Sequence, residues 1–186
     1  MLPNERRNGR IEHVYDSSPR TWRCRQEYTG RIVADLLDCP FHDLDRVFEE
    51  RHGNIDDFIR RQGYAAYARS NVETYQAIQP GWPVVLALSS GFMTYPDSTH
   101  PALPIVRRSI AMLPATFVLL PSLDVEECVA ETVRRQRERP LAQHRTDDRE
   151  ERVIRDRFPV YMALPARKVS TMRRPAEIAA EIVALS

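Results

Sequence analysis

The residues of this sequence that could do chemistry are two closely spaced acids and several arginines. Asp43 and Asp45 lie one residue apart, where an acidic pair could also serve only to favour a helix N-terminus. Arginines recur between Arg134 and Arg139, and Arg157 follows in a second polar stretch. An arginine can bind a small anion, although charge clusters of this kind usually form a solvated helix face. Residue types alone therefore leave a functional and a structural explanation open.

The overall composition limits what these residues could bind. The 186 residues include 27 Lys and Arg and 26 Asp and Glu, for a net charge of +1. This balance gives no overall field that would attract nucleic acid or an anionic membrane. No apolar run is long enough to span a bilayer, and residues 1–10 lack the apolar core of a secretory signal. We expect a cytoplasmic protein that binds neither nucleic acid nor a membrane.

Two apolar runs indicate the strands that would position a site. Residues 83–88 and 115–120 are apolar, as parallel strands buried on both faces usually are. The turns that follow them, 89–91 and 121–122, would lie at the carboxyl ends of these strands. A short edge strand is expected at 168–170. Helical spacing and capping signals predict helices at 31–38, 45–52, 55–62, 64–78, 102–113, 122–137 with Ser122 as its cap, 148–163 with a break near Pro159, and 176–185.

Strands that alternate with helices predict an α/β fold, a three-layer sandwich with a parallel sheet flanked by helices. Ligands of such folds bind beyond the carboxyl ends of the strands. We assign residues 30–186 to one domain with a lid near 137–149. Residues 1–29 are rich in arginine and show no period, so we expect an irregular segment there. The stretch 15–19 is not typical of a buried central strand, and the sheet could lack its first strand.

Several motifs, in order and at nearly constant spacing, resemble the shikimate kinases. They are Gly30-Arg31 with Ala34 and Leu37, Phe41-x-Asp43-x-Asp45, Gly53, Ile55 with Phe58 and Gly63, Arg139-Pro140-Leu141, and Arg157-x-Pro159-x-Tyr161. Each motif alone is weak, but the series from Gly30 to the end of the chain is fairly specific. The resemblance implies a nucleoside-monophosphate-kinase-like fold. It also implies an ATP- and Mg²⁺-dependent kinase that phosphorylates a hydroxyl of a small carboxylated ring, in aromatic amino acid biosynthesis.

The same resemblance implies a role for individual residues. Asp43 would face the magnesium ion, through water because Mg²⁺ keeps much of its hydration. Asp45 would bind the substrate hydroxyl and act as the catalytic base. Arg157 would bind the substrate carboxylate with two hydrogen bonds, and Arg139 would bind the nucleotide phosphates from the lid. Gly91 would let the backbone approach the substrate closely.

Two departures from the family pattern concern the substrate side of the site. The family's Gly-Gly-Gly turn is here Ser89-Ser90-Gly91, which adds bulk and hydroxyl groups. A substrate-binding arginine of the family falls on Ala68, with Arg69 next to it. Arg69 could replace it in binding substrate only if the helix turned by about 100°. Both changes bear on which acceptor the site takes.

A third departure concerns the phosphate-binding loop. Counted back from Gly30 without a gap, the family's loop should cover residues 20–28, which read RTWRCRQEY. This stretch has no glycine, so it cannot form a glycine-rich anion nest, and Glu27 would repel phosphate. We therefore predict that the chain as printed is poorly active or inactive.

The genetic code offers an explanation for the missing loop. Read from the second base of each codon, residues 20–28 permit Gly-x-Gly-Gly-Ala-Gly-Lys-Ser-Thr, the loop that the family requires. The same shift lets residues 14–16 become Phe-Met-Ile, an apolar strand. Our hypothesis is that the printed N-terminus comes from a shifted reading frame, and ordinary divergence is the alternative. The underlying DNA sequence decides between them.

Two other functions remain open from the sequence. A non-catalytic binding protein or inactive relic of the same fold would explain the missing loop, Ser89-Ser90 and Ala68. A nucleic-acid binder could use the arginines of residues 6–25, but these form no recognisable binding module. Nucleotide binding separates the first alternative from a kinase, and salt-dependent retention on DNA tests the second.

Overall fold

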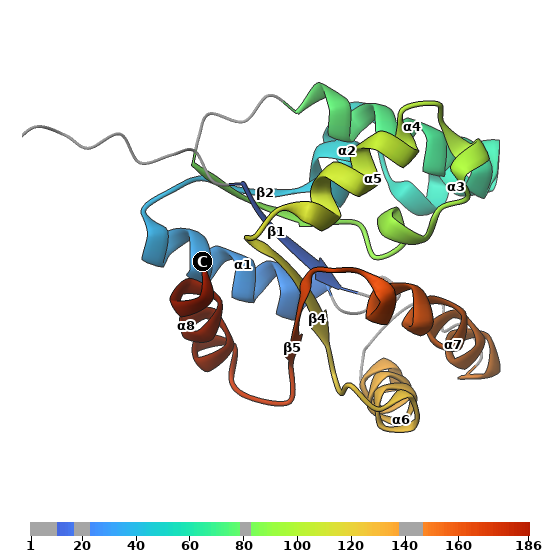
Figure 1. Ribbon diagram of the computed structural model, residues 1–186. Helices are drawn as coiled ribbons and strands as arrows, with labels where there is room; N and C mark the ends of the chain where they lie inside the picture. The colour runs from blue at the N-terminus through green and yellow to red at the C-terminus, as the bar shows by residue number, and fades with distance from the viewer. Residues whose placement is uncertain (1–10, 17–22, 79–82, 138–146) are drawn as a thin grey trace, which may run out of the picture.

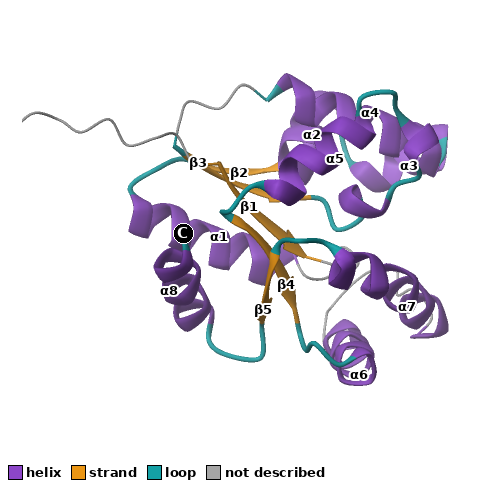
Figure 2. Ribbon diagram, in the orientation of Figure 1, coloured by secondary structure: helices purple, strands orange, loops and turns teal. Residues whose placement is uncertain are grey.

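The computed structural model describes residues 11–16, 23–78, 83–137 and 147–186. They form a three-layer α/β sandwich around a five-stranded sheet (Figures 1 and 2), as the sequence predicted. All four strand pairings are parallel, in the order β2-β3-β1-β4-β5. The strands are β1 (Ile11–Asp16), β2 (Phe41–Asp43), β3 (Val84–Leu88), β4 (Thr116–Leu120) and β5 (Arg167–Ser170).

Eight α-helices and two short 3-10 helices occupy the described residues. They are α1 (Arg23–Leu37), α2 (Leu44–His52), α3 (Ile55–Gln62), α4 (Tyr64–Ala77), η2 (Phe92–Thr94), η3 (Asp97–Thr99), α5 (Leu103–Met112), α6 (Val125–Arg137), α7 (Asp147–Ala163) and α8 (Pro175–Leu185). The predicted boundaries at Gly53 and Gly63 are confirmed. Both glycines end a helix at positive φ, 81° and 85°, where a side chain would be strained.

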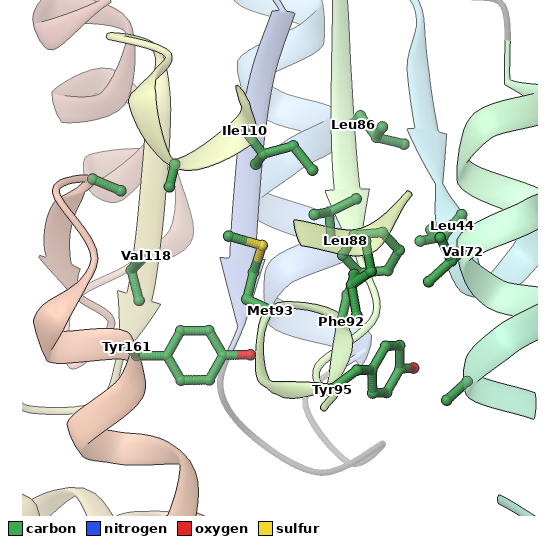
Figure 3. Close-up of a cluster of buried hydrophobic side chains, with 14 of the residues drawn as sticks. Leu44, Val72, Leu86, Leu88, Phe92, Met93, Tyr95, Ile110, Val118 and Tyr161 are labelled. Carbon is green, nitrogen blue, oxygen red and sulfur yellow. The ribbon is translucent and has the colours of Figure 1, made fainter. Parts of the chain in front are cut away.

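The two faces of the sheet bury separate cores. Helices α1 and α8 cover one face, where Val85, Phe117 and Leu119 meet Val33 and Ile178. The alternate residues of the same strands point to the opposite face, because side chains alternate along a strand. Figure 3 shows this second cluster, which includes Leu86, Leu88 and Val118 of β3 and β4 together with Phe92, Tyr95 and Tyr161. The apolar runs that predicted β3 and β4 therefore serve both cores.

The expectation of an irregular segment up to residue 29 is wrong for residues 11–16 and 23–29, and the first strand, which the sheet could have lacked, is present. Residues 11–16 form β1, which pairs with β3 on one side and β4 on the other, and α1 begins at Arg23. The sequence of β1, IEHVYD, includes Glu12, His13 and Asp16 and so lacks the apolar signal of a central strand. Main-chain hydrogen bonds on both edges place this strand, and they depend little on side-chain type.

Two further expectations about helix ends are wrong. Asp124, rather than Ser122, caps α6, because its Oδ1 accepts a hydrogen bond from the Glu127 N–H at 3.0 Å. The Ser122 hydroxyl instead donates to the Glu127 carboxylate at 2.7 Å. Helix α7 runs through Pro159 to Ala163, although an interior proline removes one helix hydrogen bond and crowds the carbonyl of residue i−4. Among the described helices, none is both long and apolar enough to cross a bilayer.

Candidate functional site

A pocket of about 490 Å³ opens beyond the carboxyl end of β3. Helices α2, α3, α4 and α7 and the turn after β3 all contribute to its wall. The lining residues are Asp45, Asp56, Ile59, Tyr64, Tyr67, Ser90, Gly91, Thr94, Tyr95, Pro96, Arg149, Val153, Asp156, Arg157 and Val160. This is the edge of a parallel sheet at which α/β proteins bind ligands.

Asp45 lies on the first turn of α2 and is 9% exposed. Its Oδ1 accepts hydrogen bonds from the Ser89 hydroxyl at 2.5 Å and from the Tyr67 hydroxyl at 3.2 Å. The Asn71 amide Nδ2 donates to Ser89 Oγ at 2.8 Å and to the Tyr95 hydroxyl oxygen at 3.0 Å. Burial is the main reason that the pKa of Tyr95 lies well above its usual value, so this side chain stays a neutral hydroxyl. Asp45 is thus a pocket carboxylate held by neutral donors.

Arg157 reaches the same pocket from α7. Its Nη1 donates to the Ser90 carbonyl oxygen at 3.3 Å, and its Nη2 donates to the Tyr64 hydroxyl at 3.5 Å. The Tyr161 hydroxyl, one helical turn further on, donates to the same Ser90 carbonyl at 2.6 Å. Two side chains of α7 therefore hold the turn after β3 against the helix. The guanidinium is half-buried at the pocket wall, where it could bind a carboxylate.

Gly91 has no room for a side chain. A Cβ atom at this position would lie 2.9 Å from the Tyr64 hydroxyl oxygen, 3.0 Å from Arg157 Nη2 and 3.1 Å from Tyr95 Cε1. Each distance is shorter than ordinary van der Waals contact, so an added methyl group would displace the Tyr64 hydroxyl and the Arg157 guanidinium. The glycine lets the turn approach the arginine closely.

We expect Gly91→Ala to displace Arg157 and to weaken binding of a carboxylated ligand roughly tenfold, with about 1–3 kcal/mol lost from the free energy of unfolding. Isothermal titration and urea denaturation measure the two effects. Gly53→Ala is the matched control, since nothing lies within 4 Å of its Cβ position. It should cost stability through its positive φ without changing affinity. Equal affinities in the two variants would show that the space at Gly91 is not part of the binding site.

The structure brings together three of the residues that the sequence predicted for the site: Asp45, Gly91 and Arg157 all line the pocket. Arg69 does not, because it lies on the exposed face of α4 while Ala68 is buried at 3% exposure. The helix is not turned as a binding role for Arg69 would need. Arg139 and residues 138–146 of the predicted lid lie outside the described residues.

Asp43 lines a different pocket, of about 270 Å³, together with Arg31, His42 and Arg46. Its Oδ1 accepts a hydrogen bond from the Arg46 N–H at 3.1 Å and so caps α2. The described residues contain no group of three or more acidic, histidine or cysteine side chains arranged for a metal. Asp43 alone would offer one carboxylate, which could hold a hydrated Mg²⁺ only through water.

Several pocket residues were not identified from the sequence as site residues. Tyr64 and Tyr67, which belong to none of the matching family motifs, line the pocket. Arg149, Val153, Asp156 and Val160 follow one another along α7 at spacings of four, three and four, which is the period of one helix face. That period could have identified them. No sequence signal linked Ser89 to Asp45, because the contact joins residues distant in the chain.

Comparison with known proteins gives a consistent result. The family model described as shikimate kinase matches residues 28–185. A shikimate kinase from Bacteroides thetaiotaomicron superposes with a TM-score of 0.66 at 18% identity, over 95% of this chain and 95% of that chain. The shikimate kinase from Acinetobacter baumannii in complex with shikimate gives 0.62 at 20% identity, over 94% of this chain and 92% of that chain. The shikimate kinase from Aquifex aeolicus superposes with a TM-score of 0.62 at 19% identity, over 93% of this chain and 95% of that chain.

These solved structures share the fold of the chain. A search of curated protein sequences finds no match.

Proposed function

The chain belongs to the shikimate kinase family, and we propose that its site transfers the γ-phosphoryl group of ATP to a hydroxyl of a small carboxylated ring, shikimate or a close relative. The observation that carries this proposal is the pocket that joins Asp45 to Arg157 beyond the end of β3. A carboxylate that can accept a hydroxyl proton and a guanidinium that can bind a carboxylate thereby line one cavity. We further propose that the protein works as a cytoplasmic monomer in aromatic amino acid biosynthesis, as its family does.

In this proposal the described residues bind and orient the acceptor. Asp45 accepts the hydrogen bond of the attacking hydroxyl and takes its proton as the phosphoryl group is transferred. Arg157 binds the ring carboxylate, and the Tyr64 hydroxyl beside it keeps the guanidinium turned toward the pocket. Mg²⁺ bound near Asp43 would neutralise charge on the phosphates. Phosphoryl transfer needs little more from a protein than such positioning and charge neutralisation.

The charges of the pocket favour an acceptor with a single carboxylate. Asp56 and Asp156 line it in addition to Asp45, while Arg149 and Arg157 are its only cationic residues within the described ranges. Ala68 stands in place of the family's arginine. A second carboxylate on the ligand would therefore face three aspartates and only two arginines among the described lining residues. A compact ring with one carboxylate and several hydroxyls therefore suits this wall better than a dicarboxylate does.

The region where the nucleotide would bind supports the hypothesis that the N-terminus comes from a shifted reading frame. The family model begins to match at residue 28, where the stretch that should hold the phosphate loop ends. Gln26, for which the shifted frame permits lysine, donates from α1 to the Leu88 carbonyl oxygen at 3.2 Å. Position 26 thus lies at the carboxyl end of β3, next to the acceptor pocket. A lysine there would bring an ammonium group to the place where phosphate must enter.

An acceptor-binding protein without kinase activity is the second candidate, and the sequence of residues 20–28 favours it. It shares the pocket with the first candidate and differs only in nucleotide binding. Titration with shikimate tests what both candidates share, and titration with ATP and Mg²⁺ separates them. If the chain does not bind shikimate, both candidates fail.

We expect Arg157→Ala to weaken shikimate binding by 10- to 100-fold, because a carboxylate would lose a charge-assisted pair of hydrogen bonds worth about 1.5–3 kcal/mol. Arg69→Ala is the matched control, since it removes the same charge from the exposed face of α4. We expect the control to change affinity less than twofold, in line with surface charges generally. Isothermal titration measures both, and a larger loss in the Arg69 variant would reverse the assignment.

A further inference from the structure

Around Asp45 lie buried polar side chains that the proposed mechanism leaves without a role. Ser89, 5% exposed, directly follows β3, and Tyr67 and Asn71 come from successive turns of α4. Tyr95 follows η2 and is 2% exposed. The four residues form one hydrogen-bonded cluster with Asp45 at its pocket end. The cluster lies where the family carries a glycine turn and the chain has Ser89.

The direction of each hydrogen bond follows from the Asn71 amide. Its Nδ2 donates to Ser89 Oγ at 2.8 Å and to the Tyr95 hydroxyl oxygen at 3.0 Å. Because Nδ2 offers only hydrogens, the hydrogen of the Ser89 hydroxyl is directed at Asp45 Oδ1, 2.5 Å away. The Tyr67 hydroxyl donates to the same oxygen. Two donors therefore converge on one oxygen of the carboxylate.

Asn71 is fully buried, and its Oδ1 has no hydrogen-bond partner among the described residues. An unsatisfied buried carbonyl oxygen destabilises the folded state. Both amide hydrogens of Asn71 are directed to hydroxyl oxygens instead. Asn71 thereby fixes the direction of the Ser89 hydroxyl, which donates to Asp45.

We propose that Ser89 and Asn71 are positioning residues, which hold Oδ1 of Asp45 so that the other carboxylate oxygen, Oδ2, meets the acceptor hydroxyl. This inference rests on the proposed function. The terminal torsion of an aspartate is broad, so a carboxylate without such donors samples many orientations. Two donors on one oxygen fix it, which is the preorganisation that phosphoryl transfer requires. Ser89 then acts through Asp45 and does not touch the reacting atoms.

A double-mutant cycle on the full chain tests the inference. Shikimate affinity is measured by isothermal titration for the wild type, Ser89→Ala, Asp45→Ala and the double variant. We expect Ser89→Ala to weaken binding roughly fivefold to tenfold, and to change it less than about twofold once Asp45 is already Ala, which leaves the Ser89 hydroxyl no acceptor at position 45. Tyr67→Phe, which keeps the ring packing, should behave in the same way with a smaller effect because its bond is longer. Gln76→Ala, exposed on the same helix, should leave affinity unchanged.

Urea unfolding of the same variants separates positioning from simple stabilisation. Coupling between Ser89 and Asp45 in both affinity and stability supports the proposal. Coupling in stability alone, with the affinity of Ser89→Ala unchanged, overturns it, and so does an affinity loss of equal size with Asp or Ala at position 45. If Asp45→Ala itself leaves shikimate affinity unchanged, the proposed function of Asp45 fails instead, so the two failures are distinguishable. Should Ser89→Ala not fold, Ser89→Gly supplies the residue that the family carries there.

Discussion

We expect a frame-restored chain, in which the codons up to residue 28 are translated from their second base, to bind ATP and to phosphorylate shikimate. The printed chain should do neither. Phosphate binding in this fold depends on backbone N–H groups of a glycine-rich loop and on its lysine, and RTWRCRQEY supplies neither. At an ATP concentration of about 100 times its dissociation constant, the restored chain should gain roughly 2.7 kcal/mol, a rise of about 5–10 °C in melting temperature. The printed chain should show no rise.

Thermal denaturation with and without ATP and Mg²⁺ measures this difference, and a coupled ADP assay measures turnover. The matched control is the restored chain with the lysine that replaces Gln26 changed to methionine, which removes the charge but keeps the glycines. It should lose most of the activity while the fold is kept. The frame hypothesis is falsified if the codons for residues 20–28 do not spell the loop in the second-base frame. ATP-dependent stabilisation of the printed chain would equally contradict the prediction.

The central strands of this fold could be predicted from the sequence only where their residues form an apolar run. Strands β3 and β4 were predicted because every one of their residues is buried, so their sequences are apolar except for Thr116. Strand β1 pairs with both of them but carries Glu12, His13 and Asp16, and pattern reading therefore missed it. Strand β1, whose sequence lacks an apolar signal, is also the strand whose residues 14–16 would become apolar in the shifted frame.

Only those site residues that belong to a motif at family spacing could be predicted from the sequence. Asp45 and Arg157 were identified because each belongs to a motif at family spacing, and both line the pocket. Arg69 was a weaker candidate, and helix geometry decides against it, because Ala68 faces the core and its neighbour must turn away by about 100°. Asp43 has the type and spacing for a metal, yet the structure shows a helix cap that the sequence allowed equally.

The donors around Asp45 could not have been predicted. Ser89 and Asn71 are separated from it by 44 and 26 positions, and nothing in a single sequence pairs a serine with an aspartate at such distances. Only the fold brings these residues together, because β3 ends beside the first turn of α2 and α4 contributes Tyr67 and Asn71 to the same place. The same fold explains why a serine is tolerated in place of a glycine there, since its hydroxyl has a carboxylate to bind.

In the frame-restored chain, Asp45→Ala should lower the turnover of shikimate by 10²- to 10⁴-fold, the range that a general base usually contributes. The change also leaves the Ser89 and Tyr67 hydroxyls without their shared acceptor, so about 1–3 kcal/mol of stability should be lost. Asp45→Asn separates the two effects, because it keeps an oxygen acceptor of the same shape but cannot take a proton. We expect it to retain most of the stability and as little turnover as the alanine variant.

Steady-state kinetics with saturating ATP, together with urea unfolding of each variant, make the comparison. Asp56→Asn is the matched control, since Asp56 lines the same pocket but lies exposed on α3. Its kcat should fall less than tenfold, because a carboxylate at the rim affects the pocket through charge alone. If Asp45→Asn retains near wild-type kcat, the base is some other group, and the joining of Asp45 to Arg157 in one pocket would then explain only how the acceptor is bound.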